Sequence, residues 1–138
     1  MKVNNEYMKG LLDAFESSET PLTDIYVLKD KGFSYEEDIF VFHMDILLDK
    51  GFIESKSNTN GIGYRLMSDR SKVWSVIPLR LTAQGHEFID SLNEPDVWEN
   101  IQKNFKDSSI DTIKSVSKDL AIGFAKKKVT ELLTSDDS

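Results

Sequence analysis

Residues 79–92, with the sequence LRLTAQGHEFIDSL, pass from a strand into a helix with almost no connecting segment. Thr82 is suited to cap the helix, and apolar residues follow it at helical spacing. Gly85 falls in the first turn, where a residue without a side chain lets a second backbone segment approach closely. We therefore predict an architectural role for Gly85 at this junction.

Apolar periodicity and capping signals predict four further helices. They cover residues 4–17, residues 35–50 after a capping box of Ser34 and Glu37, a short helix beginning at Pro95, and residues 109–133 after Ser108. Residues 25–33 are ambiguous between a short helix and an extended segment.

Alternating residues predict strands in the middle of the chain. The segments FIESK and GYRLM lie on either side of Asn60-Gly61, which favours a hairpin between them. Residues 72–81 form a further predicted strand, in which Pro78 lacks an amide donor and indicates an edge or a bulge.

Two helices, a hairpin-like sheet and a helix at the end of a strand follow one another in the order of a winged helix. We predict an α+β fold with a winged-helix core over residues 1–93. An additional C-terminal helical segment over residues 94–134 is expected to pack on that core or to form a dimer seam, and residues 135–138 are expected to be a disordered tail.

Several phrases resemble one family of bacterial and phage domains of unknown function. The resemblance runs from about Asn5 to Phe105 and departs at Ala83, where the family has an aromatic residue. Its phrases are His43 before Gly51, Arg80-Leu81-Thr82, Gly85-His86-Glu87-Phe88 and Val97-Trp98. More distantly, the chain is similar to winged-helix regulators of the MarR and PadR type. The resemblance implies a fold and brings no known activity.

Composition narrows the classes of function. The 138 residues contain no cysteine, which excludes a thiolate metal site and a cysteine nucleophile, and the net charge is -7. No phosphate-binding loop or nucleophile elbow occurs, so we expect no enzyme and no cofactor. Without a signal peptide or membrane-length apolar run, a cytoplasmic protein without membrane contact is expected.

The two histidines are the chemical candidates. His43 lies on the apolar face of helix 35–50, and His86 lies at the edge of the apolar face that follows Gly85. Because no His/Cys cluster supplies further ligands, we expect no metal site. A buried ring with a hydrogen-bond partner is the prediction for His43.

The outward face of helix 35–50 bears on nucleic-acid binding. Asp38, Asp45 and Asp49 form an acidic stripe there, and such a stripe repels a DNA duplex. Beside it, Val41, Met44 and Leu48 form a second apolar stripe. We interpret this stripe as either a surface for a partner protein or a surface that the C-terminal helix covers.

Residues 51–80 have a net charge of +3 and include the predicted wing. Basic and aromatic side chains alternate there, which is typical of a surface that follows a phosphate backbone. The wing candidates are Lys56, Arg65, Arg70, Lys72 and Trp74, with Tyr64 among them. An ordinary solvated sheet is the alternative interpretation.

The chain is therefore interpreted as a small regulatory or adaptor module that contacts an unknown partner protein or a second copy of itself. A nucleic-acid-binding regulator that uses the basic wing, with weak affinity, is the alternative.

Overall fold

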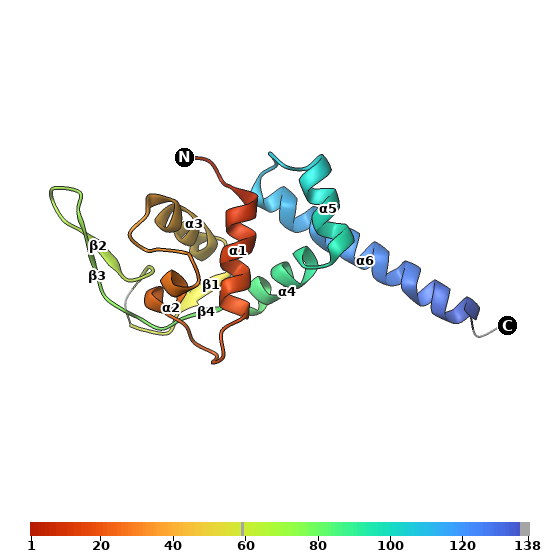
Figure 1. The fold of residues 1–138 in the computed structure, drawn as a ribbon, viewed down its shortest axis with the longest axis horizontal. Helices are drawn as coiled ribbons and strands as arrows, with labels where there is room; N and C mark the ends of the chain where they lie inside the picture. The colour runs from red at the N-terminus through yellow and green to blue at the C-terminus, as the bar shows by residue number, and fades with distance from the viewer. Residues whose placement is uncertain (59, 136–138) are drawn as a thin grey trace. The chain divides into compact units, whose positions relative to one another are not determined.

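The structure is a computed structural model that describes residues 1–58 and 60–135. It is α+β and divides into two compact units, Met1–Glu87 and Phe88–Ser138. Figure 1 shows the elements in chain order. The predicted tail lies outside the described residues, except that Ser135 belongs to the last helix.

The first unit begins with three helices, α1 (Asn5–Glu16), α2 (Ile25–Asp30) and α3 (Asp38–Asp49). Asn4 caps α1 and Asp24 caps α2, each with a side-chain oxygen that accepts backbone N–H groups. The ambiguous segment is thus helical. Apolar side chains from all three helices are buried, and these include Met8, Leu11, Leu12, Ile25, Leu28, Phe40 and Leu47.

The capping box predicted for α3 is wrong. Ser34 accepts the backbone N–H of Glu36 in a turn, and the helix begins only at Asp38 after Glu37, which makes no side-chain cap. A hydroxyl can bond to nearby backbone in a turn as readily as at a helix start. The predicted end of the helix is confirmed, since Gly51 follows it with φ +73°.

Two small antiparallel sheets replace the predicted hairpin around Asn60-Gly61, which is wrong. Strand β1 (Ile53–Ser55) pairs with β4 (Leu79–Leu81), and β2 (Tyr64–Leu66) pairs with β3 (Lys72–Trp74). The tight turn is at residues 67–71, where Met67 and Ser71 are hydrogen-bonded. Thr23 forms a bridge with Leu79 on the other edge of β4.

The single strand predicted over residues 72–81 is divided between the two sheets. Pro78 lies just before β4, and its carbonyl accepts the N–H of Lys56. The segment between β3 and β4 is irregular, as expected for a segment that contains a residue without an amide donor.

Helix α4 (Ala83–Leu92) follows β4 directly. Helices α5 (Pro95–Asn104) and α6 (Ile110–Ser135) pack together in the second unit, whose buried side chains include Val97, Ile101 and Ile113. Pro95 is the first residue of α5, as predicted. The cap of α6 is Ser109 rather than Ser108, because the Ser109 hydroxyl accepts the N–H of Thr112.

Candidate functional site

The Thr82–Gly85 junction connects two of the phrases that carry the family resemblance, namely the one that ends at Gly51 and the one that begins at Arg80. Thr82 donates its hydroxyl to the carbonyl of Gly51 at 2.5 Å and its backbone N–H to the carbonyl of Phe52 at 3.0 Å. The same hydroxyl accepts the N–H of Gly85 at 3.1 Å, which confirms the predicted cap. Thr82 therefore links the segment after α3 to the first turn of α4.

The close approach predicted for Gly85 is confirmed. A Cβ atom at this position would lie 2.0 Å from the carbonyl oxygen of Phe52, which belongs to the backbone. Such a contact is far inside van der Waals distance, so any side chain here would force the two backbone segments apart. Thr82 and Gly85 therefore hold the segment after α3 and the first turn of α4 together.

His43 is buried and hydrogen-bonded, as predicted, with 2% of its surface exposed. Its Nε2 atom accepts the backbone N–H of Asn4 at 2.9 Å, and Nδ1 lies 2.7 Å from the carbonyl oxygen of Ile39. Because a carbonyl only accepts, Nδ1 carries the proton and the ring is neutral. The imidazole thus attaches the start of α1 to α3.

Burial lowers the pKa of His43, and the bond to Ile39 raises it by less. The Tyr7 ring stacks beside the imidazole, with centroids 4.8 Å apart. Burial, with a smaller contribution from Glu37, raises the pKa of the Tyr7 phenol to about 12. Both groups are therefore neutral at ordinary pH.

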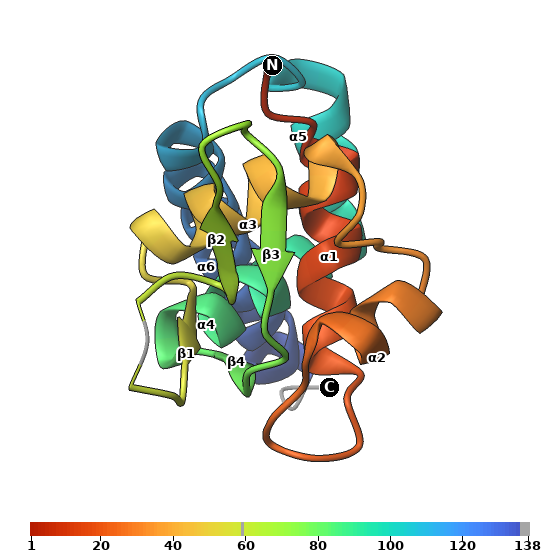
Figure 2. The ribbon, with the colours of Figure 1, turned by 90° about the vertical axis from the view of Figure 1, so that its left-hand side faces the viewer.

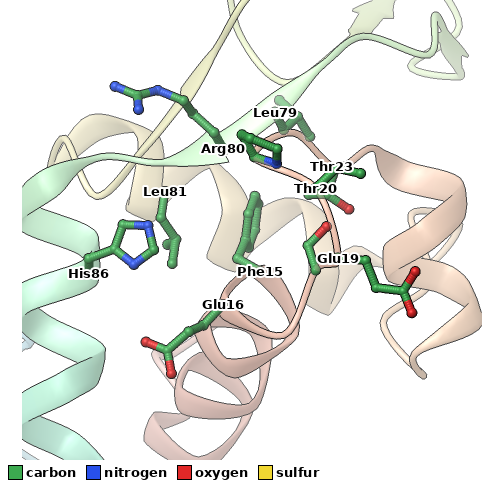
Figure 3. A pocket seen from close by; sticks show the side chains of 11 residues that line it. Phe15, Glu16, Glu19, Thr20, Thr23, Leu79, Arg80, Leu81 and His86 are labelled. Atoms are coloured by element: carbon green, nitrogen blue, oxygen red, sulfur yellow. The ribbon is translucent and has the colours of Figure 1, made fainter.

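His86 lies elsewhere, exposed at the rim of a hollow of about 350 Å³. Figure 3 shows the His86 ring on α4 and the side chains of Phe15 and Glu16 on α1 around this hollow. The guanidinium of Arg80 extends away from Phe15, and its Nε donates to Glu54 at 2.5 Å. No group of three or more metal-ligating side chains occurs among residues 1–58 and 60–135.

Part of the outward face of α3 contacts the ribbon, which is the name used for β2, β3 and their turn (residues 64–74). Figure 2 shows β2 and β3 passing in front of α3. The Tyr64 hydroxyl donates to Asp45 at 2.6 Å, and the Lys72 ammonium lies 3.8 Å from the Asp38 carboxylate. Asp45 and Asp38 therefore contact the ribbon, while Asp38 and Asp49 are both exposed.

The apolar stripe predicted beside those carboxylates is partly wrong. Met44 has 0% of its surface exposed and belongs to the core, while Val41 and Leu48 are half-buried. Val41 lines a groove together with Trp74 of the ribbon. The Trp74 ring also packs on Phe40, with centroids 6.4 Å apart. The ribbon therefore shields part of the stripe that we expected a partner or the C-terminal helix to cover.

The basic residues of the wing differ in their surroundings. Lys56 lies 3.3 Å from Glu54, a carboxyl whose pKa is lowered by hydrogen bonds from Arg80 and Lys56. Lys72 faces Asp38. Arg65 and Arg70 are exposed and have no acidic partner within the part of the chain that the structure describes.

The aromatic rings of the ribbon point inward. Trp74 contacts Tyr64 and Tyr35, each with centroids 5.3 Å apart. The bond to Asp45, followed by burial, raises the pKa of Tyr64 to about 12. Alternation along each strand directs Arg65 and Val73, which are cross-strand partners, away from α3. Val73 is 47% exposed and Leu66, near the turn, is 60% exposed.

These features define a small α+β domain with a structural signature at the strand–helix junction and a ribbon folded over its third helix. The chain belongs to the family described as "Hypothetical protein (DUF2513)", whose profile matches residues 2–111. The predicted resemblance to a family of unknown function is thereby confirmed.

The chain is also similar to an uncharacterized protein of Haemophilus influenzae (strain ATCC 51907 / DSM 11121 / KW20 / Rd). The two are 27% identical over 121 residues, which cover 85% of this chain and 92% of the relative. No solved structure matches the chain. Within residues 1–58 and 60–135, no helix has the length and apolar character to cross a membrane.

Proposed function

We propose that this domain is a small, non-enzymatic regulatory or adaptor module of the winged-helix type, and that it binds a partner protein through the outer face of the ribbon. The observation that carries the proposal is the exposure of apolar side chains beside unpaired arginines on one small element. The exposed apolar residues of the ribbon are Leu66, Met67 and Val73, of which Val73 lies on the outer face with Arg65, and Val76 is exposed just after the ribbon.

The order of elements supports the winged-helix interpretation. Helix α1, the bridging residue Thr23, helices α2 and α3, strand β1, the ribbon and strand β4 follow one another along the chain. In this interpretation Thr23, β4 and β1 form the small sheet, and the ribbon lies within the wing. Helix α3 would then be the helix that reads DNA in winged-helix regulators.

Two observations favour a protein partner over DNA. The face of α3 that would enter a groove carries Asp38, Asp45 and Asp49, and the ribbon lies on it. In addition, the Tyr64 and Trp74 rings, which we considered as part of a surface that follows a phosphate backbone, pack inward. The partner surface that we expected on α3 is therefore proposed for the outer side of the ribbon instead.

A photo-crosslinking amino acid at position 73 tests the proposal. In cells of the source organism, we expect Val73 to yield a crosslink to one protein, with no equivalent product from the exposed Glu99 of α5. The purified partner should bind the full chain and should bind the Arg65→Glu variant at least about tenfold more weakly. Equal products from both positions, or equal affinities, would contradict the proposal.

Nucleic-acid binding is the second candidate, because Arg65 and Arg70 are exposed and have no acidic partner among the described residues. We expect only weak binding to generic duplex that disappears at physiological salt, as counterion release requires, and that charge reversal at Arg65 and Lys72 abolishes. Substitution of Asp45 by Lys would break the bond from Tyr64, so Asp49→Lys is the cleaner test of repulsion. Gel shifts at two salt concentrations measure both effects.

A further inference from the structure

The backbone of the ribbon has unused hydrogen-bonding groups on its edges. Met67 and Ser71 are hydrogen-bonded, and Ser75 donates to the carbonyl of Gly63. In an antiparallel ladder, bonded pairs alternate with non-bonded pairs, so the pairs Tyr64–Trp74 and Leu66–Lys72 are of the non-bonded kind. The N–H and C=O groups of Lys72 and Trp74 therefore point to the open edge of β3.

A groove of about 310 Å³ adjoins the side chains of β3. Val41 of α3 contributes an apolar wall, and the rings of Tyr35 and Trp74 contact each other edge to face. The remaining lining residues are polar or charged, namely Glu36, Asp38, Arg70, Ser71 and Lys72. The groove could receive an aliphatic side chain from a strand that lies along β3.

Charge indicates which kind of segment would be attracted. The two acids of the groove already face cations, because Glu36 pairs with Lys29 and Asp38 faces Lys72. Arg70 at the turn and Arg65 on the outer face remain without acidic partners in the described chain. Asp69 of the turn, which accepts hydrogen bonds from Ser71, offsets one of these two arginines. The unpaired charge of the ribbon is thus weakly positive, which favours an acidic segment and disfavours a second copy of the same ribbon.

We propose that the open edge of β3 takes up an extended acidic segment of another protein as an added strand. This inference rests on the proposed function and specifies the class of partner that the ribbon binds. The backbone groups of Lys72 and Trp74 pair with the segment. Alternate aliphatic side chains of the segment enter the groove beside Val41, and its carboxylates lie near Arg70.

The probe is a phage-displayed library of random 12-residue peptides, selected on the full-length chain, followed by synthesis of the strongest binder. The selected peptides should carry aliphatic residues at alternate positions and several carboxylates. An ester scan of the peptide replaces one backbone N–H at a time. We expect about tenfold weaker binding at every second position and little change at the positions between them, since only alternate residues face β3.

A pair of protein variants tests the same edge. Lys72→Pro removes an N–H that points away from β2 and should weaken the peptide at least about tenfold. Lys72→Ala keeps that N–H and removes only the ammonium that faces Asp38, so it should weaken the peptide clearly less than Lys72→Pro. The ester scan keeps the test decisive if the proline variant does not fold. Failure to select any peptide, an ester effect without alternation, or equal binding by a folded proline variant would overturn the proposal.

Two further outcomes distinguish this inference from the proposed function. A dimer that forms in the unmodified chain and is lost in Lys72→Pro would mean that a second copy occupies the edge, which overturns the proposal. A crosslinked partner at Val73 whose affinity is unaffected by Lys72→Pro would leave the outer face as the binding surface and would refute strand addition.

Discussion

The Thr82–Gly85 junction, where a strand passes into a helix, and the ribbon, where two strands are joined by a turn, differ in what they leave exposed. At the junction, Thr82 uses its hydroxyl and its N–H on Gly51 and Phe52, and Gly85 leaves no space for a side chain. The ribbon leaves backbone groups, arginines and apolar side chains exposed. The recognisable sequence motif thus belongs to the region that stabilises the fold, while the surface that we propose for binding carries no such motif.

The largest expected effect lies at the junction. Gly85→Ala places a Cβ atom 2.0 Å from the Phe52 carbonyl oxygen, and we expect a loss of about 3 kcal/mol or more in the free energy of unfolding. Denaturant titration measures it. Gly123→Ala is the matched control, because this glycine lies within α6 with nothing near its Cβ position, and it should stabilise by up to about 1 kcal/mol. The same sign for both substitutions would refute the packing argument.

On the ribbon, Trp74→Ala removes ring contacts with Tyr35, Phe40 and Tyr64. Since Trp74 is half-buried, we expect a loss of about 2 kcal/mol, less than for a fully buried ring. Val73→Ala on the outer face should cost less than about 0.5 kcal/mol. If the two substitutions cost the same in chemical denaturation, the ribbon does not pack on α3 as described.

Acid should weaken the attachment of α1 to α3. The pKa of His43 is lower in the folded chain than its ordinary value of 6.5, so the unfolded chain binds the proton more readily. The contribution of neutral His43 to the free energy of unfolding is fully present above about pH 6.5. It is lost as the pH falls below that value, because a protonated Nε2 no longer accepts the N–H of Asn4. Unfolding of the His43→Gln variant, followed from pH 7.5 to 5, should show a shallower pH dependence than the parent.

The smallest expected effect concerns the bond between Tyr64 and Asp45. Tyr64→Phe should cost about 1 kcal/mol, as for one hydrogen bond to a charged group that is partly exposed. The folded pKa of about 12 lies above the ordinary value of 10, so this contribution is present below pH 10 and is lost as the pH rises toward 12. Spectroscopic titration should show one late-ionising tyrosine fewer in the variant. An unchanged titration would mean that Tyr64 is not bound to Asp45.

Sequence reasoning succeeded where a local signal and the tertiary structure agree. The roles of Thr82 and Gly85 could be predicted from the short sequence around them. The helices begin and end close to the predicted residues. His43 lies on an apolar helical face and is buried. Each of these predictions depends only on the pattern of residues within one helix or turn, and those residues are adjacent in the sequence.

Pairing between distant segments was not predictable in the same way. Asn60-Gly61 has turn chemistry, yet β1 pairs with β4, more than twenty residues away, because apolar Ile53 and Leu81 meet in the core. The position of the ribbon on α3 depends on Tyr64 reaching Asp45 and on Trp74 reaching Phe40, and no periodicity contains those contacts. Arg65 and Val73 lie on one face of the ribbon because they are cross-strand partners, and only the structure determines which face packs on α3.

Amide chemical shifts of the full-length chain, recorded as the selected acidic peptide is added, test the contrast between the two regions in one experiment. The account predicts large changes at residues 64–76 and at Val41, with residues 51–52 and 82–86 unchanged. Large changes at Gly51, Thr82 and Gly85, with a ribbon that does not respond, would contradict it and would make the signature junction the binding site.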